Sequence, residues 1–299
     1  MKKIVSLFLI LSGLLIQAQN QRFFYDYKYI PDSTNKAEVL SEMMILDVTK
    51  SGSNYYSHEK FVSDSIMKAE LEKQIQSGAG NININKGGNQ GKIDFRVTKS
   101  YPDYKVFLYK SISTDQYKIS EDQKPEWKIF PDKEKIGEYD AQKATTDFGG
   151  RKWIAWFATD IPINDGPYKF YGLPGLIVKV EDITGSHVMT LVGNKSFQPV
   201  EEKDLQLPNE IKTFGFGDKE IEITKKQYKK LWKDYVNDPA KNIREIMMKS
   251  SPEGKVTLKV KTQDGKEISD PNQIYRNIET RVKENLKKNN NPIEPDLLQ

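Results

Sequence analysis

Apolar and polar residues alternate along most of the first 200 positions, which is the period of a half-buried β-strand. Residues 23–31 and 41–62 are rich in aromatic and β-branched side chains, and "KSGSN" (50–54) predicts a hairpin turn inside the second segment. Similar segments follow from residue 93 to about 200, separated by turn-like runs such as "SYPDY", "FPDKE" and "PINDGP". Strands that succeed one another without a helix between them predict an antiparallel sheet.

A short helix is predicted over residues 63–76, where apolar side chains recur every fourth position and Ser63 or Asp64 can cap the first turn. The next segment, "SGAGNININKGGNQGK" (77–92), is so rich in Gly and Asn that it buries little apolar surface. We therefore expect a loop there, with no more than a weak strand.

After residue 207 the pattern becomes mainly helical. Thr224 and Gln227 have the three-residue spacing of a capping box, and residues 272–288 carry an apolar stripe at helical spacing. One more strand is expected at 255–262. The chain is thus predicted to form a single α+β domain over residues 19–299, strand-rich to 206 and helix-rich from 207, with a mainly antiparallel sheet and three or four amphipathic helices.

The first eighteen residues have the pattern of a secretory signal peptide. Lys2 and Lys3 precede an apolar run from Ile4 to Ile16, and Ala18 is a small residue suited to cleavage. The run is too short for a spanning helix, and no second run approaches that length. We expect an exported mature chain that begins near Gln19 and has no transmembrane anchor.

Composition mainly narrows the classes of function. The chain has no Cys, so no disulfide forms and a buried core must supply the stability. Without Lys2 and Lys3 the balance of basic and acidic residues changes from 46 against 42 to 44 against 42, which gives no electrostatic case for a nucleic-acid partner. Lysines gather after residue 224; a solvated helix face and a contact with acidic headgroups or another anionic partner both explain them.

Catalytic chemistry finds little support in the residues. His58 and His187 are the only histidines, so a zinc site rich in His or Cys is excluded, and we expect no metal or cofactor. Ser186 precedes His187, but neighbouring residues of a strand point to opposite faces. We expect a protein that is not an enzyme, with a carboxylate-dependent hydrolase as a remote alternative.

The segment "YKFYGLPGLIVKVED" (168–182) places two glycines and a proline inside an apolar, strand-like run. "LPGL" (173–176) predicts a type II β-turn, because Pro174 presets φ at the second position and Gly175 supplies the positive φ of the third. Gly172 is expected to serve a close backbone approach or a second unusual φ. Both a structural corner and a rigid loop that contacts a ligand or partner explain this composition.

The longer stretch "GRKWIAWFATDIPINDGPYKFYGLPGLIVKVEDITGSH" (150–187) closely resembles the signature of the GLPGLI family, secreted proteins of Bacteroidetes-type bacteria named after the hexapeptide at 172–177. The preceding "IGEYDAQKATTDFGGR" and the "NNPIE" segment near the end are similar to that family too, although many relatives carry Cys where this chain has Ala141. The resemblance implies a location in the periplasm or at the outer-membrane periphery. It implies no activity, because the family has no established biochemical function.

The layout also resembles periplasmic lipoprotein carriers, in which an antiparallel sheet curls around helices as an open half-barrel with an apolar concave face. That resemblance implies a protein that binds an apolar or amphipathic ligand near Trp153, Phe157 and neighbouring aromatics, for which ordinary core packing is the alternative. A second reading is an accessory protein that docks on an outer-membrane transport or assembly partner. The positions expected to carry the role of the signature are Arg151, Trp156, Gly166, Pro167, Tyr168, Phe170, Gly172, Leu173, Pro174 and Gly175.

Overall fold

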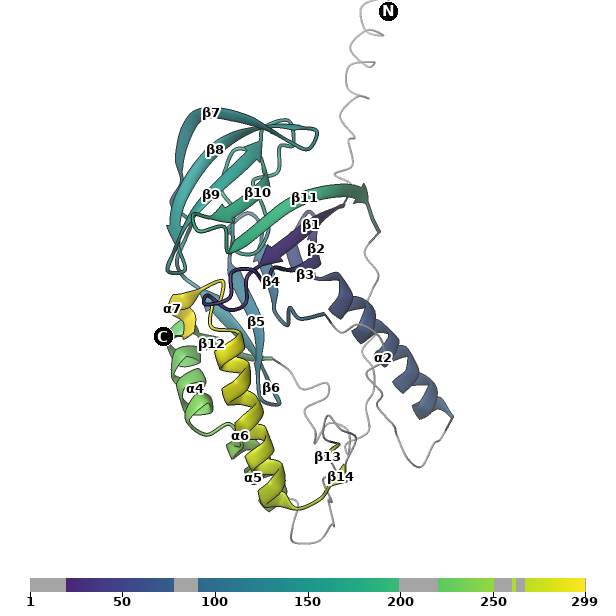
Figure 1. Ribbon diagram of the computed structural model, residues 1–299. Helices are drawn as coiled ribbons and strands as arrows, with labels where there is room; N and C mark the ends of the chain where they lie inside the picture. Colours follow the sequence, from purple (N-terminus) through teal and green to yellow (C-terminus); the bar gives the residue numbers. More distant parts are fainter. Residues whose placement is uncertain (1–19, 78–90, 199–219, 250–259, 262–266, 299) are drawn as a thin grey trace, which may run out of the picture.

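A computed structural model describes residues 20–77, 91–198, 220–249, 260–261 and 267–298 of the chain (Figure 1). The predicted signal peptide, most of the segment expected as a Gly- and Asn-rich loop, and most of the strand expected at 255–262 lie outside these residues.

Twelve strands form one sheet in the order β12-β6-β5-β4-β3-β2-β1-β11-β10-β9-β8-β7. All neighbours pair antiparallel except β12 and β6, which are parallel. The bounds are β1 Gln21–Tyr29, β2 Leu40–Val48, β3 Gly52–Ser57, β4 Arg96–Ser100, β5 Val106–Ile112, β6 Asp115–Glu121, β7 Lys128–Ile136, β8 Tyr139–Phe148, β9 Arg151–Ala158, β10 Leu176–Asp182, β11 His187–Ser196 and β12 Ile221–Thr224. Two short strands, β13 Val260–Lys261 and β14 Glu267–Ile268, pair with each other.

The predicted α+β class with a mainly antiparallel sheet is confirmed, but the expected half-barrel is wrong. The sheet is open, with β7 and β12 at its two edges, as a half-barrel would be, but it is not strongly curled (Figure 1). One face of the sheet is called the inner face here. The loop between β9 and β10 covers its side chains, so this face does not surround an open interior. This face includes Tyr25, Met44, Tyr55, Val97 and Leu108, which are all buried.

Five helices lie among the described residues: α2 His58–Gln76, α4 Lys225–Asn237, α5 Lys241–Lys249, α6 Pro271–Lys288 and α7 Pro295–Leu298. α2 begins five residues before the predicted start, because the Ser57 side chain accepts a hydrogen bond from the Lys60 N–H (3.1 Å) and caps the helix there. The capping box of Thr224 and Gln227 is confirmed at the start of α4. None of the described helices is long and apolar enough to cross a membrane.

Three local expectations need correction or addition. The segment "FPDKE" lies inside β7 and is not a turn; Pro131 is tolerated because β7 is an edge strand, where a missing N–H need not leave a partner unsatisfied. The short strand β12 and the helix α7 had no prediction.

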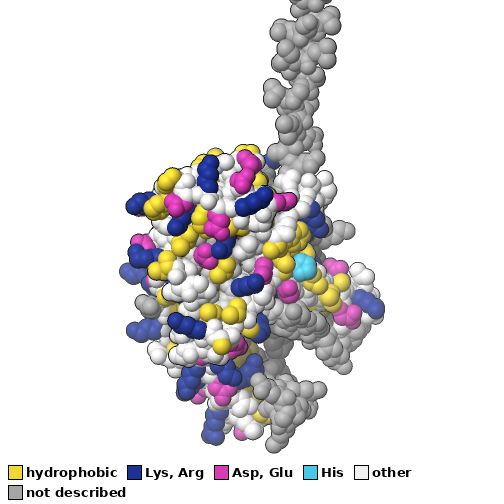
Figure 2. All heavy atoms as spheres, turned by 45° about the horizontal axis from the view of Figure 1, so that its top comes forward, with side chains coloured by type: hydrophobic (Ala, Val, Ile, Leu, Met, Phe, Trp, Pro, Cys, Tyr) yellow, Lys and Arg dark blue, Asp and Glu magenta, His cyan; other side chains and the backbone are white. Residues whose placement is uncertain are grey.

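On the surface seen in Figure 2, basic and acidic side chains are interspersed over the sheet.

Candidate functional site

The segment between β9 and β10, residues 159–175, is called the signature loop here, and it packs its own side chains onto the inner face. The Phe170 ring contacts the ring of Trp153, with centroids 4.9 Å apart, and Tyr168 contacts Phe95 at 5.2 Å. Trp153, Tyr168 and Phe170 are each at most 1% exposed, and Phe157 is equally buried. The aromatics expected to line a ligand face are therefore core residues.

Trp156 lies on the opposite face of β9 and is 8% exposed. The Lys143 ammonium lies 6.0 Å from its ring, and Lys179 is its partner on β10. Trp156 is therefore not brought together with the signature loop, although both were expected to belong to one site.

The side chain of Lys99, on β4, binds the backbone of the signature loop. Its ammonium donates to the carbonyl oxygens of Gly166 (2.7 Å), Tyr168 (2.9 Å) and Phe170 (3.3 Å), and it pairs with Asp165 at 2.5 Å. Tyr168 adopts a positive φ of +54°, an unusual conformation for a residue other than glycine, within this run of inward-directed carbonyls. Four acceptors around one fully buried ammonium fix the loop in one conformation.

Asp165 completes this cage. Its carboxylate accepts hydrogen bonds from the Ser53 hydroxyl (2.6 Å), the Tyr101 hydroxyl and the Gly166 N–H (2.6 Å), and no part of its side chain is exposed. Burial lowers the pKa of Lys99, while the charge of Asp165 acts in the opposite direction. The ion pair of Lys99 and Asp165 could not be predicted from local patterns, because 66 positions separate the two residues.

The predicted type II turn at 173–176 is wrong. The Gly175 N–H donates to Leu173 (2.8 Å), while the Leu176 N–H donates to Ile161 (3.0 Å) and leaves the turn without its defining bond. The φ of Gly175 is +154°, far from the roughly +80° of a type II turn. Glycine is required for a different reason: a Cβ at this position would collide with the carbonyl oxygen of Ala158.

The other signature residues shape the same loop. Gly172 has a φ of +93°, which confirms the unusual backbone expected there, and a Cβ on Gly166 would lie 2.7 Å from the side chain of Ile177. Pro167 accepts a hydrogen bond from the Phe170 N–H (3.2 Å). At the hexapeptide, Gly172 and Pro174 are exposed and the remaining four residues are buried, Leu173 among them.

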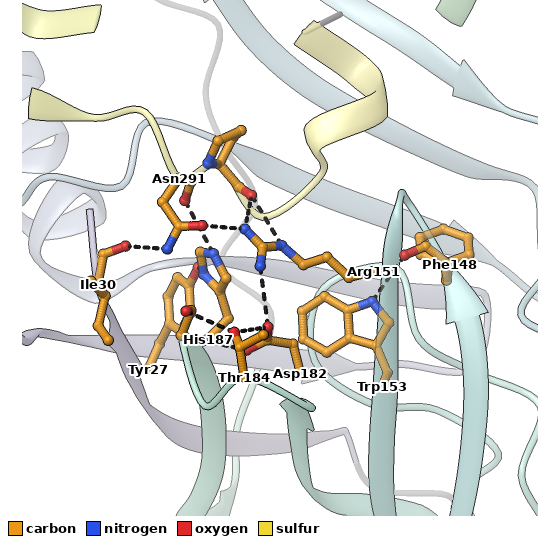
Figure 3. Close-up of polar contacts among 11 residues, drawn as sticks. Tyr27, Ile30, Phe148, Arg151, Trp153, Asp182, Thr184, His187 and Asn291 are labelled. Carbon is orange, nitrogen blue, oxygen red and sulfur yellow. Dashed lines mark hydrogen bonds and ion pairs between the residues drawn. The ribbon is translucent and has the colours of Figure 1, made fainter. Parts of the chain in front are cut away.

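Arg151 connects β9 to residues 289–298, called the strap here (Figure 3). Its guanidinium pairs with Asp182 (3.1 Å) and donates to the carbonyl oxygen of Pro292 (2.7 and 3.2 Å) and to the side-chain oxygen of Asn291 (2.6 Å). This planar fork engages three acceptors at once, Asp182 on one side and Asn291 and Pro292 on the other, which a lysine ammonium does not reproduce (Figure 3). The structure therefore brings Arg151 to the "NNPIE" segment, 140 residues away.

His187 supports the same strap contact. One ring nitrogen lies 2.7 Å from the Tyr27 hydroxyl and the other 3.1 Å from the carbonyl oxygen of Asn291, while Asp182 accepts from the His187 N–H (2.8 Å). Burial, reinforced by the charge of Arg151, lowers the pKa of His187 to about 3. The imidazole is therefore neutral at pH 7 and acts as a hydrogen-bonding support between β1, β11 and the strap.

A second group of charges anchors the strap at Glu294. The Glu294 carboxylate accepts a hydrogen bond from the Tyr168 hydroxyl (2.7 Å) and pairs with Lys169 (2.6 Å) and Lys225 (3.3 Å). Lys169 also pairs with Glu121 of β6 (2.7 Å). Signature loop, strap, β6 and the start of α4 therefore meet at one buried charge cluster.

This cluster does not have the electrostatics of a proton-donating acid pair. Burial by itself would raise the pKa of Glu294, but the Lys169 and Lys225 ammonium groups outweigh it and the pKa is lowered. Among the described residues no group of three or more His, Cys, Asp or Glu side chains is placed to hold a metal ion. The arrangement around the signature is suited to fastening segments together.

A family model described as "protein of unknown function (Porph_ging)" matches residues 148–179. Residues 148–179 are a GLPGLI-family segment. A search of the curated proteins finds no match to this chain. The structures of PNGF-II in the P21 and C2 space groups are similar at 14% identity, with TM-scores of 0.46 and 0.44, over 72% and 82% of this chain. The chain spans about a third of the length of PNGF-II, 33% and 35% in the two structures.

Outside the GLPGLI-family segment, a groove of about 1270 Å³ lies on the outer face of the sheet, opposite the inner face and beside α2. Tyr56, Arg96, Tyr109 and Lys118 are successive cross-strand neighbours on β3 to β6 and line it. The Arg96 guanidinium lies 3.7 Å from the Tyr109 ring centre, and the Lys118 ammonium 4.0 Å from that of Phe107. The groove thus combines aromatic rings with cations along one row.

The wall of the groove adds polar groups. Arg22 forms a bidentate pair with Asp47 (2.6 and 2.7 Å), and Phe61 on α2 packs against the Tyr56 ring at 5.4 Å. The side-chain oxygen of Asn54 is buried and accepts no hydrogen bond from any described residue. Sequence reasoning missed this groove, because alternation identifies the outward residues of each strand but not which strands are neighbours.

Proposed function

We propose that this protein is a non-catalytic, exported protein of the cell envelope that binds an amphipathic ligand in the outer-face groove. The observation that carries the proposal is the size of this groove together with its row of aromatic and cationic side chains. The signal-peptide pattern of residues 1–18 supports export, and the GLPGLI-family segment supports a place in the periplasm or at the outer-membrane periphery.

The groove offers different surfaces to the two parts of an amphipathic molecule. Phe61, Phe107 and Tyr109 supply apolar surface for the hydrocarbon part, whose transfer from water is favourable. The side-chain oxygen of Asn54 has no hydrogen-bond partner among the described residues, and a buried acceptor without a partner costs about 1–3 kcal/mol. A hydroxyl or amide group of a bound molecule would supply a donor to this oxygen.

The inner face is a weaker candidate, because the signature loop already fills it. A ligand there would have to displace Phe170 and Tyr168, which contact Trp153 and Phe95, together with the loop that Lys99 holds. The outer groove needs no such displacement of core residues. We therefore propose that the ligand binds on the outer face and not on the inner face.

The test is native mass spectrometry of the full chain purified from its own cell envelope. We expect a reproducible added mass of lipid size on the parent protein and its loss from a Phe107→Ala/Tyr109→Ala variant. Ile129→Ala is the matched control, because Ile129 is 47% exposed on β7 and does not line the groove. A bare parent mass, or an added mass that survives in the groove variant, contradicts the proposal.

A second candidate function is docking on an outer-membrane transport or assembly partner. It is favoured by the filled inner face, since a carrier of the half-barrel type would leave that face open. The exposed Pro174 is the position at which a photo-reactive residue would test it. A bare mass in the native spectrum together with one reproducible cross-linked partner would favour docking over ligand binding.

A further inference from the structure

The helices after residue 224 concentrate positive charge. α4, α5 and α6 together contain thirteen Lys or Arg and four Asp or Glu. The whole chain has a net charge of only +4, so the remaining residues are acidic on balance. On the sheet surface in Figure 2, by contrast, both signs are interspersed.

The solvent-facing side of α4 carries lysines without ion-pair partners. Lys226, Lys230 and Lys233 recur at helical spacing on the side opposite Tyr228, which is fully buried against β6. All three are exposed, and none has an ion pair within the part of the chain that the structure describes. Lys225, at the edge of that side, is the contrasting case, because it pairs with Glu121 and Glu294.

α6 lies beside α4 in Figure 1 and repeats this pattern. Ile274 faces inward and is 1% exposed, while the exposed side chains include more cations than acids. Five of these cations are exposed and have no ion pair to any described residue: Arg276, Arg281, Lys283, Lys287 and Lys288. Together with Lys226, Lys230 and Lys233 they are called the basic surface here.

Elsewhere on the molecule, some surface cations are paired: Lys60, Arg96, Lys105, Lys118 and Lys152 each lie within 3.3 Å of a carboxylate oxygen. Others, such as Lys36, Lys50 and Lys135, are exposed and have no ion pair to any described residue. The basic surface differs from the rest of the molecule in the concentration of its cations, since α4, α5 and α6 hold thirteen of them against four acidic residues. Its like charges repel one another, so the folded protein retains electrostatic energy that a negatively charged partner would release.

We propose that the basic surface docks the protein on a lipid bilayer that carries anionic headgroups. The cations extend along roughly 11 Å of α4, from Lys226 to Lys233, and roughly 18 Å of α6, from Arg276 to Lys288, at 1.5 Å per residue. They do not line the outer-face groove, and their spread along two helices suits a broad, laterally mobile layer of negative charge better than a single small anion. Clusters of four to eight cations are of the size that binds such surfaces.

One apolar side chain fits the same partner. Met248, at the end of α5, is 72% exposed, the largest exposure among the large hydrophobic residues of the described chain. α5 is held beside α6, because the Tyr275 hydroxyl lies 3.3 Å from the Met247 sulfur and Arg244 stacks on the Tyr275 ring. An unbranched side chain of this kind can enter the boundary between headgroups and hydrocarbon.

The proposal is tested by co-sedimentation of the full mature chain with vesicles. The probes are phosphatidylcholine vesicles with and without phosphatidylglycerol, at low and at high salt. We expect binding to the anionic vesicles only, and its loss at high salt through screening. Each lysine near such a surface contributes about fivefold in affinity, so a K226Q/K230Q/K233Q variant is expected to bind about 100-fold more weakly.

The matched control is K28Q/K105Q/K152Q, which removes the same charge from lysines with 58%, 71% and 66% exposed side chains outside the basic surface. The control is expected to bind nearly as the parent does. Equal losses in both variants, equal binding to neutral vesicles, or no binding to either vesicle would overturn the proposal. Binding to soluble polyglutamate but not to vesicles would also overturn it, in favour of an acidic protein partner. Unchanged circular dichroism and melting of the α4 variant exclude unfolding as the cause.

Discussion

Replacing Lys99 by Met tests whether a buried ion pair locks the signature loop. The variant would leave the Asp165 carboxylate at 0% exposure with hydrogen-bond donors but no cation, and would leave the three loop carbonyls without the ammonium donor. Breaking a buried ion pair by removing one partner costs about 3–5 kcal/mol. We therefore expect a loss of about 4 kcal/mol in unfolding free energy and a fall in melting temperature on the order of 10 °C.

The assay is urea unfolding at pH 7 with thermal melting as a second readout. Lys110→Met is the control, because Lys110 pairs with Asp94 at 3.3 Å on the partly exposed surface, and we expect a loss below about 1 kcal/mol. The double variant Lys99→Met/Asp165→Asn should lose less than the sum of its single variants, since it no longer buries a lone charge. A Lys99→Met loss below about 1 kcal/mol, or strictly additive losses, would refute the reasoning.

Three further predictions concern the same region. Gly175→Ala should lower the unfolding free energy by about 3 kcal/mol, because its Cβ would collide with the backbone of Ala158. Gly172→Ala should lower it by only about 1–2 kcal/mol, because of the positive φ at that position. Urea unfolding measures both losses, and equal losses would contradict the packing argument. Burial lowers the pKa of His187 in the folded protein to about 3, below its ordinary value of 6.5. The contribution of His187 to the unfolding free energy is therefore full above pH 6.5 and falls as the pH drops toward 3. His187→Gln should therefore flatten the stability slope between pH 6.5 and about 5, above the range in which carboxylates titrate, and an unchanged slope would contradict it. Arg151→Lys should increase hydrogen exchange in residues 289–298, because an ammonium replaces a three-acceptor fork, and unchanged protection would show that the strap is held by other contacts.

Local patterns predicted most elements of this fold. Alternation located the strands from β1 to β11, and the capping box located the start of α4. The early start of α2 was missed because Ser57 ends a strand and caps a helix at once. The strand character of "FPDKE" was missed because a proline inside a strand is acceptable only at a sheet edge, and the edge is a property of the whole sheet.

The candidate site was predicted less completely. The signature residues Arg151, Tyr168 and Phe170 were singled out from the sequence, but the residues that they contact were not predicted. Lys99 carries a decisive charge at a position with no distinctive local pattern, and Glu294 lies in the "NNPIE" segment without any local sign of its ion-pair partners. An isolated Lys or Glu in a sequence predicts a solvated side chain, and only burial against a specific partner reverses that expectation.

The sequence by itself determined the class of fold, the mainly antiparallel pairing of its strands, the GLPGLI-family resemblance and the unusual backbone at Gly172. These follow from periodicity and from backbone sterics, which act over a few neighbouring residues. Only the tertiary structure decided that the signature loop fills the inner face, that it is fastened by Lys99 and the strap, and that the groove lies on the outer face. The physical reason is that burial, ion pairing and cross-strand neighbours depend on which distant segments meet, and no local pattern encodes that choice.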